Sequence, residues 1–269
     1  MNHAGLKYEE MKRGTAWVVV WENAAFFAVN KASGLALCPE RWDRDRDSLV
    51  RLLEKERGKR LFVCHRIDRE TSGLAVFAKT SDAHKRLSAA FEKRLVQKRY
   101  TVILHGHPLW RETDCDLPLL PDGNKKHGTI VDKYRGKPSR TCFRVLFSAG
   151  SYTVAEAEPY TGRTHQIRVH AAALGHPVVC DTLYGSANRN KTGEAVYLSS
   201  FKRGWRGDKF AERPLLARLG LHAAALTLPV ECGLQEPLFL EALPPRDMAA
   251  TVAQMEKCGS APYGGIDNG

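Results

Sequence analysis

Two polar segments carry most of the side chains that could do chemistry. The first, HRIDRETSGL, places Asp68 between Arg66 and Arg69. Guanidinium groups near a carboxylate favour its ionised form, so Asp68 could act as a nucleophile or as a base. The same pattern is also typical of a structural turn, in which an Asp followed by Thr, Ser and Gly caps its own backbone. The segment alone leaves both interpretations open.

The second polar segment is GRTHQIRVH, from Gly162 to His170. Its Thr, His, Gln and Arg side chains offer many hydrogen-bond donors around the start of an expected helix. Such a helix start is suited to holding an anion, because its first backbone N–H groups have no partner within the helix. A solvated helix start with two satisfied histidines is the competing interpretation for each residue taken singly.

Motifs for other kinds of chemistry are missing. The chain has no G-x-x-x-x-G-K-[ST], no G-x-G-x-x-G and no G-x-S-x-G. It also lacks the H-x-E and P-C-x-x-C pattern of zinc deaminases. Its seven cysteines include no C-x-x-C pair and are odd in number, which favours reduced thiols in a cytoplasmic protein over disulfides or a zinc site.

The charge balance points to an anionic partner. The 269 residues include 41 Lys and Arg against 30 Asp and Glu, a formal net charge of +11. That excess favours nucleic acid first and a membrane surface second. The apolar run from Ala16 to Trp21 is far shorter than the ~20 residues of a membrane-spanning helix. No apolar signal core follows the first five residues, so we expect neither secretion nor a membrane partner.

The elements that must position the two segments form a pattern typical of the α+β class, with a mainly antiparallel sheet. Strands are predicted within 16–30 and 61–79, and at 100–104, 141–147 and 151–159. Helices are predicted at 47–58, 81–95 and 164–174. Asp68 then lies in a polar turn between two strands. Basic residues gather on the 81–95 helix and in 122–137, which is expected to form exposed loops or a hairpin, and 259–269 is expected to be a frayed tail.

Five elements, in order, resemble the RluA-type family of RNA pseudouridine synthases. HRIDRETSGLAVFAK resembles the family signature around its catalytic aspartate. The other four are NKASGL before it, Lys98-Arg99-Tyr100, GRTHQIRVH with Gly175-His176-Pro177 and Asp181…Tyr184-Gly185 behind it, and the closing Leu221-His222-Ala223 and Ala242-Leu243-Pro244. The resemblance runs from about Trp17 to about Pro245. Ala32 replaces a usual proline and Cys180 a usual glycine, and neither change touches the implied chemistry.

The resemblance implies a pseudouridine synthase fold, with a mixed, mainly antiparallel central sheet flanked by helices and loops. We expect an N-terminal extension over 1–15, a catalytic domain over 16–248 and a C-terminal tail over 249–269. The small S4 RNA-binding domain of many relatives is not expected. The implied activity is an isomerisation, conversion of a specific uridine in structured rRNA or tRNA to pseudouridine, with no cofactor and no metal.

The family pattern also assigns roles to residues. Asp68 is the implied catalytic carboxylate, with attack on C1′, addition to uracil C6 and abstraction of a sugar proton all left open. Tyr100 is expected to stack on the flipped uracil and is a candidate for the final C5 proton, and Arg168 is expected to pair with Asp68. Arg66 is expected to fill the space left by the flipped base. The further candidate RNA-binding residues are His65, Lys31, Arg69, Thr71, Arg163, Thr164, His165 and Gln166.

Two other classes of function compete with this one. A catalytically inactive RNA-binding protein could use the same scaffold, although binding alone does not need Asp68, Tyr100 and Arg168 together. A hydrolase using His65 and Asp68 is a weaker alternative, because no oxyanion hole or metal site is evident. We expect a monomer in the cytoplasm.

Overall fold

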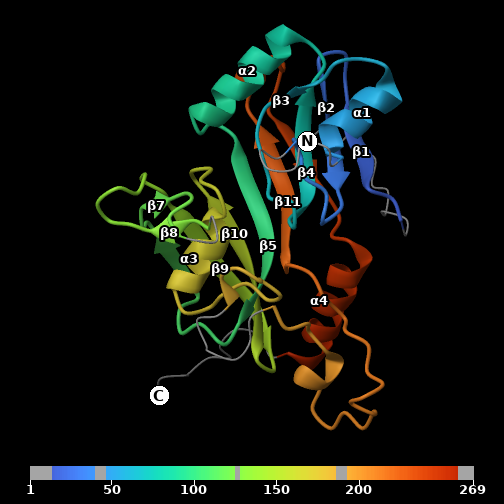
Figure 1. The fold of residues 1–269 in the computed structure, drawn as a ribbon, viewed down its shortest axis with the longest axis vertical. Helices are drawn as coiled ribbons and strands as arrows, with labels where there is room; N and C mark the ends of the chain where they lie inside the picture. Colours follow the sequence, from blue (N-terminus) through green and yellow to red (C-terminus); the bar gives the residue numbers. More distant parts are fainter. Residues whose placement is uncertain (1–13, 40–46, 125–127, 186–192, 260–269) are drawn as a thin grey trace. The chain divides into compact units, whose positions relative to one another are not determined.

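The computed structural model describes residues 14–39, 47–124, 128–185 and 193–259. Two compact units divide the chain. Unit 1 comprises Met1–Arg99 and His222–Pro245, and unit 2 comprises Tyr100–Leu221 and Arg246–Gly269. Each unit combines a largely antiparallel sheet with helices, which confirms the predicted α+β class (Figure 1). No helix in the described part of the chain has the length and apolar character needed to cross a membrane.

Unit 1 is built on strands in the order β1-β2-β4-β11, with β3 paired to β4 and β12 paired to β11. All these pairs are antiparallel except β4 with β11, which makes the sheet mixed. The strands are β1 (Trp17–Glu22), β2 (Phe26–Lys31), β3 (Phe62–Val63), β4 (Ser72–Ala78), β11 (Leu221–Leu228) and β12 (Leu238–Glu241). The helices are α1 (Leu49–Arg57), α2 (Ser81–Glu92) and the short 3-10 helix η3 (Val230–Cys232).

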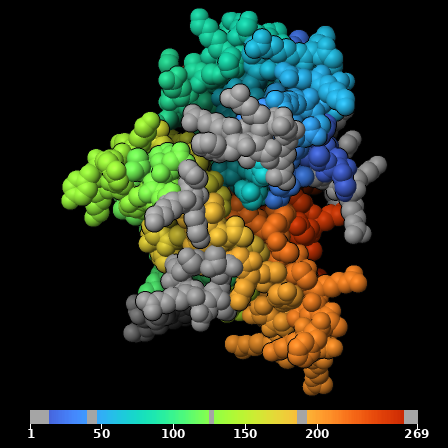
Figure 2. Space-filling model, viewed as in Figure 1, coloured from blue at the N-terminus to red at the C-terminus, as the bar shows by residue number. Residues whose placement is uncertain are grey.

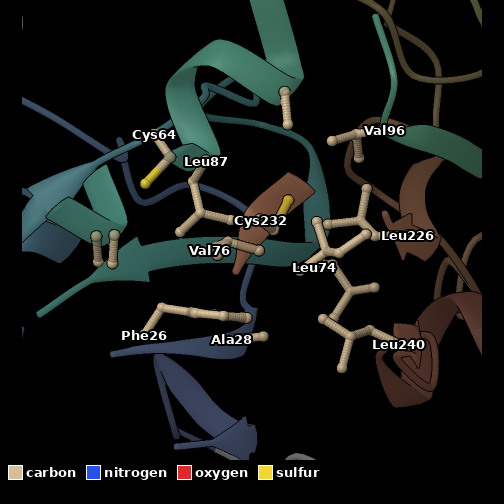
Figure 3. Close-up of a cluster of buried hydrophobic side chains, with 14 of the residues drawn as sticks. Phe26, Ala28, Cys64, Leu74, Val76, Leu87, Val96, Leu226, Cys232 and Leu240 are labelled. Carbon is tan, nitrogen blue, oxygen red and sulfur yellow. The ribbon is translucent and has the colours of Figure 1, made fainter. Parts of the chain in front are cut away.

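Alternation along the two central strands gives unit 1 a core on each face of its sheet. Phe26 and Ala28 of β2 lie with Leu74 and Val76 of β4 in one cluster, together with Leu87 of α2 (Figure 3). The intervening residues of both strands lie in a second cluster, which contains buried side chains of α1. Because successive side chains of a strand point to opposite faces, α1 and α2 must cover opposite faces of this sheet.

A glycine and a histidine fix β4 against β11. Gly73 has φ +111, and a Cβ there would lie 2.2 Å from the carbonyl oxygen of Ala223, so only glycine permits this approach. His222 is fully buried. Its Nδ1 lies 3.0 Å from Ser72 Oγ and its Nε2 lies 2.9 Å from the carbonyl oxygen of Ala242. These contacts fix the start of β4, directly after the polar turn that carries Asp68.

Unit 2 is built on antiparallel strands in the order β5-β10-β9-β6, with a separate β7-β8 hairpin. The strands are β5 (Gln97–His105), β6 (Glu112–Cys115), β7 (Leu119–Leu120), β8 (Ile130–Val131), β9 (Thr141–Ala149) and β10 (Tyr152–Pro159). The helices are α3 (Gln166–Ala173), the 3-10 helix η2 (Leu198–Ser200) and α4 (Arg246–Cys258). The sheet again has two cores, one containing α3 side chains and the other containing α4 side chains.

The C-terminal boundary differs from the expectation. The predicted tail over 249–269 begins inside α4, which runs to Cys258. Met248, Thr251 and Met255 are fully buried, and their spacing places them on one side of the helix, against unit 2. Residues 249–258 are therefore helix rather than tail. Residues 1–13 of the predicted extension over 1–15 and residues 260–269 of the predicted tail lie outside the described residues, and the bounds of the catalytic domain remain a prediction.

Candidate functional site

Asp68 lies in the connection between β3 and β4, in a turn closed by a hydrogen bond from the Thr71 amide to the Asp68 carbonyl oxygen at 3.2 Å. The short segment after β2 holds this turn from outside. The Gly34 amide donates to the Arg69 carbonyl at 2.8 Å, and the Ser33 hydroxyl donates to the Glu70 carbonyl. Two segments far apart in the sequence are thus joined through backbone carbonyls directly after Asp68.

Lys31 holds the same turn from the interior of unit 1. Together with Ser33 and Gly34 it forms what we call the clamp of the Asp68 turn. Its ammonium group donates to the carbonyls of Ala32, Leu35 and Arg69 at 2.8, 2.8 and 3.0 Å, and the side chain is fully buried. A buried ammonium requires such acceptors to compensate for lost hydration. The structure therefore places Lys31 inside unit 1 and not on the RNA-binding surface that the sequence analysis expected.

His65 is partly exposed, and its ring contacts the backbone of β4 and a side chain of α2. Its Nε2 accepts a hydrogen bond from the Val76 amide at 2.9 Å, and its ring stacks on Phe91 with centroids 4.3 Å apart. Burial, with a smaller contribution from the positive charge of Lys98, lowers the pKa of His65 to about 3. The ring is then neutral at physiological pH, and the RNA contact of this partly exposed side chain remains a prediction.

The remaining candidates of unit 1 differ in exposure. Arg66 is exposed, Asp68 and Arg69 are partly exposed, and Thr71 is buried. Strand β3 ends at Val63, so Arg66 lies in irregular backbone rather than in an extended strand shared with Asp68. Lys98 belongs to the Lys98-Arg99-Tyr100 element of the family resemblance, although no role was expected for it. Burial, with repulsion from Arg94, lowers the pKa of its ammonium to about 8.

In unit 2, the segment before α3 is fixed by Gln166. The Oε1 atom of this buried side chain accepts from the Thr161 hydroxyl at 2.6 Å and from the Arg163 amide at 3.0 Å. Its Nε2 atom donates to the Arg140 carbonyl and to Thr141 Oγ1, both at 2.9 Å. Gln166 therefore shapes the loop that precedes the helix, in place of the expected RNA contact.

Arg168 makes a buried, bidentate ion pair that the sequence analysis did not anticipate. Its Nε and Nη2 atoms lie 2.7 and 2.8 Å from the two carboxylate oxygens of Asp181. The Leu183 and Tyr184 amides also donate to Asp181, at 2.9 and 3.1 Å. Burial raises the pKa of Asp181, but the hydrogen bonds and the charge of Arg168 outweigh it and hold that pKa below its ordinary value.

Tyr184 links this ion pair to the start of α3. The Arg168 guanidinium lies 5.1 Å from the centre of the Tyr184 ring, and the Tyr184 hydroxyl lies 2.8 Å from His165 Nδ1. His165 is the N-terminal cap of α3 and has a left-handed backbone, with φ 54. The Asp181…Tyr184-Gly185 spacing in the sequence was the available signal for this arrangement.

The other predicted residues of unit 2 lie near these groups in the chain. Arg163 and Thr164 are partly exposed, and Arg163 Nε donates to the Pro138 carbonyl at 3.2 Å. Tyr100 lies on β5, partly buried against the cluster that contains α3 side chains. Asp68 belongs to unit 1, whereas Tyr100 and Arg168 belong to unit 2, so the pairing of Asp68 with Arg168 remains a prediction.

The predicted basic surfaces are only partly described. The exposed cations of α2 and of the segment after it are Lys85, Arg86, Lys93 and Arg94, and those of the 122–137 segment are Lys133, Arg135 and Lys137. Lys125 and Lys126 lie outside the described residues. Arg86 pairs with Asp82 and Arg135 with Asp132, each at 2.9 Å. Across residues 14–39, 47–124, 128–185 and 193–259, no group of three or more His, Cys, Asp or Glu is arranged to hold a metal ion.

Comparison with known proteins shows which family this chain resembles. Residues 25–173 match the family model described as RNA pseudouridylate synthase. The chain is 35% identical over 170 residues to the dual-specificity RNA pseudouridine synthase RluA of Escherichia coli K12, covering 63% of this chain and 77% of the relative. It is 38% identical over 185 residues to the RluA protein of Vibrio vulnificus, covering 67% and 74%.

Solved structures agree with this assignment. The human RNA pseudouridylate synthase domain containing 4 protein superposes with a TM-score of 0.68 and 25% identity, covering 91% of this chain and 94% of that one. The human domain containing 1 protein shows the same fold, with a TM-score of 0.66 and 24% identity over 96% and 95% of the two chains. The family model spans both the Asp68 turn and α3. The chain therefore belongs to the RNA pseudouridine synthase family, as a member of its RluA type.

Proposed function

We propose that this isomerase converts specific uridines of rRNA or tRNA to pseudouridine, with Asp68 as its catalytic carboxylate. The observation that carries the proposal is the clamped turn of unit 1. Lys31, Ser33 and Gly34 hold the backbone directly after Asp68, while the Asp68 side chain stays partly exposed. A reacting group that is fixed by its surroundings and still accessible meets the geometric requirement of catalysis.

The reaction exchanges one bond to ribose for another. The bond between C1′ and N1 of uracil breaks, the uracil rotates, and a bond between C1′ and C5 forms. The C5 proton then leaves, and N1 is protonated. Asp68 acts on the sugar or on the uracil as a nucleophile or a base, which an ionised carboxylate can do. Tyr100 stacks on the uracil, and Arg168 keeps Asp68 ionised and aimed.

The target base must leave its stack before it reaches Asp68, at a cost of roughly a few kcal/mol. Arg66 is exposed and stands two residues before Asp68. We assign it to the space that the flipped uridine leaves, where a long, planar and permanently charged side chain can also contact the neighbouring phosphates.

Release of tritium from RNA labelled with [5-³H]uridine tests the activity and its substrate together. The purified protein should release tritium from an rRNA or a tRNA transcript, to a plateau equal to the number of modified sites. Mapping of pseudouridine in the product then gives the position. RNA binding without tritium release from either transcript would instead identify an inactive RNA-binding protein.

A further inference from the structure

Unit 2 carries a long exposed loop that none of the roles above uses. It runs from Lys202 to Arg213 (KRGWRGDKFAER), between the buried side chains of Phe201 and Leu216. In Figures 1 and 2 this orange segment extends outward from the rest of unit 2. Its exposed cations are Lys202, Arg203, Arg206, Lys209 and Arg213.

The two acidic residues of the loop are engaged by backbone amides. Asp208 Oδ1 accepts from the Phe210 amide at 2.9 Å, and Glu212 Oε1 accepts from the Ser199 amide at 2.8 Å. None of the five loop cations takes part in an ion pair within the described ranges. The carboxylates therefore hold the backbone in place, and the cations remain available to an anionic partner.

Two aromatic side chains interrupt the cations. Phe210 is fully exposed, at 101% of its reference area, on a turn closed by a hydrogen bond from the Ala211 amide to the Asp208 carbonyl at 3.2 Å. Trp205 is partly exposed. A Cβ on Gly207 would lie 2.3 Å from Cζ2 of Trp205, so the indole ring packs directly on the glycine backbone.

The base of the loop borders a polar cavity of about 690 Å³. Lys202 and Arg203 line it, and His107, Ser148 and Ser199 supply imidazole and hydroxyl groups to its wall. Cations beside hydrogen-bonding side chains suit a ribose-phosphate backbone. Exposed aromatic rings and guanidinium planes in turn suit unpaired bases, whose faces are free to stack.

We propose that the 202–213 loop is a second RNA-binding surface, which binds an unpaired stretch of the substrate. One base stacks on Phe210, and the cations contact neighbouring phosphates. This inference rests on the proposed function in that it assumes an RNA substrate, but it assigns the loop no part in the chemistry. Its effect should lie in RNA affinity and not in turnover of bound RNA.

Phe210→Ala tests the stacking contact, and Leu109→Ala is its matched control because Leu109 is 91% exposed elsewhere on unit 2. Loss of one stacked base should raise the Kd for substrate RNA about tenfold. Phe210→Trp should retain wild-type affinity, and kcat at saturating RNA should stay within about twofold in all three variants. An unchanged Kd for Phe210→Ala would overturn the stacking contact.

Arg206→Gln/Lys209→Gln/Arg213→Gln tests the phosphate contacts. Each lost contact to single-stranded RNA should lower the slope of log Kd against log salt by about 0.7. The control Lys55→Gln/Lys59→Gln/Lys257→Gln removes the same charge from exposed positions elsewhere and should change the slope much less. Equal slopes for the two triple variants would contradict a local site.

The two proposals fail in distinguishable ways. RNA binding that depends on the loop, in a wild-type protein that forms no pseudouridine, would contradict the proposed function and leave the loop assignment standing. Normal turnover with no change in binding by the loop variants would contradict the loop assignment alone.

Discussion

At the scale of single residues, two buried cationic side chains hold separate segments of the chain together. Lys31 binds three carbonyls around the Asp68 turn, and Arg168 binds both oxygens of Asp181. Neither contact could be inferred from spacing, because each joins separated segments. The family resemblance gave Lys31 an RNA-binding role and Arg168 a role beside Asp68. Both side chains thus also stabilise the fold.

Lys31→Met should disturb both stability and chemistry. Removal of a charged donor to three carbonyls should lower the free energy of unfolding by about 2–4 kcal/mol. The released turn should also lower kcat more than it changes KM, because the position of Asp68 matters most in the transition state. Urea denaturation and steady-state kinetics give both values. Lys55→Met, at an exposed position, is the control, and equal effects of the two variants would contradict the clamp.

Arg168→Met should leave Asp181 as a buried charge without its cation, which costs about 3–5 kcal/mol. Arg168→Met/Asp181→Asn removes that charge and should recover part of the loss. A double-mutant cycle by urea denaturation measures the coupling. Additive losses across the cycle would show that the two side chains do not stabilise each other.

The same double variant distinguishes the structural role of Arg168 from its proposed effect on Asp68. If Arg168 also faces Asp68, its removal takes away a positive charge that favours the ionised carboxylate. The acid limb of kcat/KM should then move to higher pH, in the double variant but not in Asp181→Asn alone. An acid limb at the wild-type position in the double variant would contradict the pairing of Arg168 with Asp68.

At the scale of elements, the sequence was most informative where hydrophobic periodicity and end signals agreed. Helices were predicted at 47–58, 81–95 and 164–174, and α1, α2 and α3 confirm them within a few residues. Gly58 ends α1 in a left-handed conformation, as expected. The strands predicted within 16–30 are also confirmed, as β1 and β2, and in the turn between them the Asn23 side chain accepts the amides of Ala25 and Phe26.

Elements that depend on distant partners were missed. Strands β6, β11 and β12 are stabilised by pairing with strands elsewhere in the chain, which local patterns do not show. The C-terminal helix α4 was partly taken for tail, because only its contacts with unit 2 reveal the buried stripe of Met248, Thr251 and Met255. Parallel pairing of β4 with β11 likewise depends on Gly73, whose close contact is with Ala223.

The connection between β3 and β4 should be acid-sensitive through His65. Its pKa is about 3 in the folded chain, against 6.5 for an unperturbed histidine. The unfolded chain therefore binds more protons between these values, and stability falls as the pH drops from about 6.5 toward 3. His65→Gln keeps an acceptor for the Val76 amide but cannot titrate. Between pH 7 and pH 5, wild type should lose roughly 1–2 kcal/mol more than the variant in urea denaturation. Identical losses of stability in the two proteins would contradict a neutral His65.

At the scale of the whole molecule, the net charge of +11 suits a protein that must bind RNA before it can act on one base. The described structure distributes its cations between two uses. Lys31 and Arg168 are buried in ionic or carbonyl contacts, whereas Arg66 and the 202–213 loop are exposed. Charge alone predicted an anionic partner, but only burial separates framework cations from those available to RNA.

Arg66→Ala should show whether base flipping needs this side chain. The loss in kcat/KM should be large for a uridine stacked in a stem-loop, and smaller for the same uridine in a short unpaired strand, where little stacking must be broken. Both substrates are compared at one salt concentration, because phosphate contacts depend on salt. An equal loss on both RNAs would make Arg66 a phosphate contact without a role in flipping.

We propose that Asp68 supplies the reacting carboxylate from a turn that folds without the charge of this side chain. Asp68→Asn keeps the shape of the side chain, and Glu70→Gln, at an exposed position of the same turn, is its control. The decisive measurement is tritium release from [5-³H]uridine RNA under single-turnover conditions, with RNA affinity and thermal unfolding recorded in parallel. We expect no release by Asp68→Asn, RNA affinity within about tenfold (~1.4 kcal/mol) of wild type, and normal release by Glu70→Gln. Pseudouridine formed by purified Asp68→Asn above background would contradict this proposal.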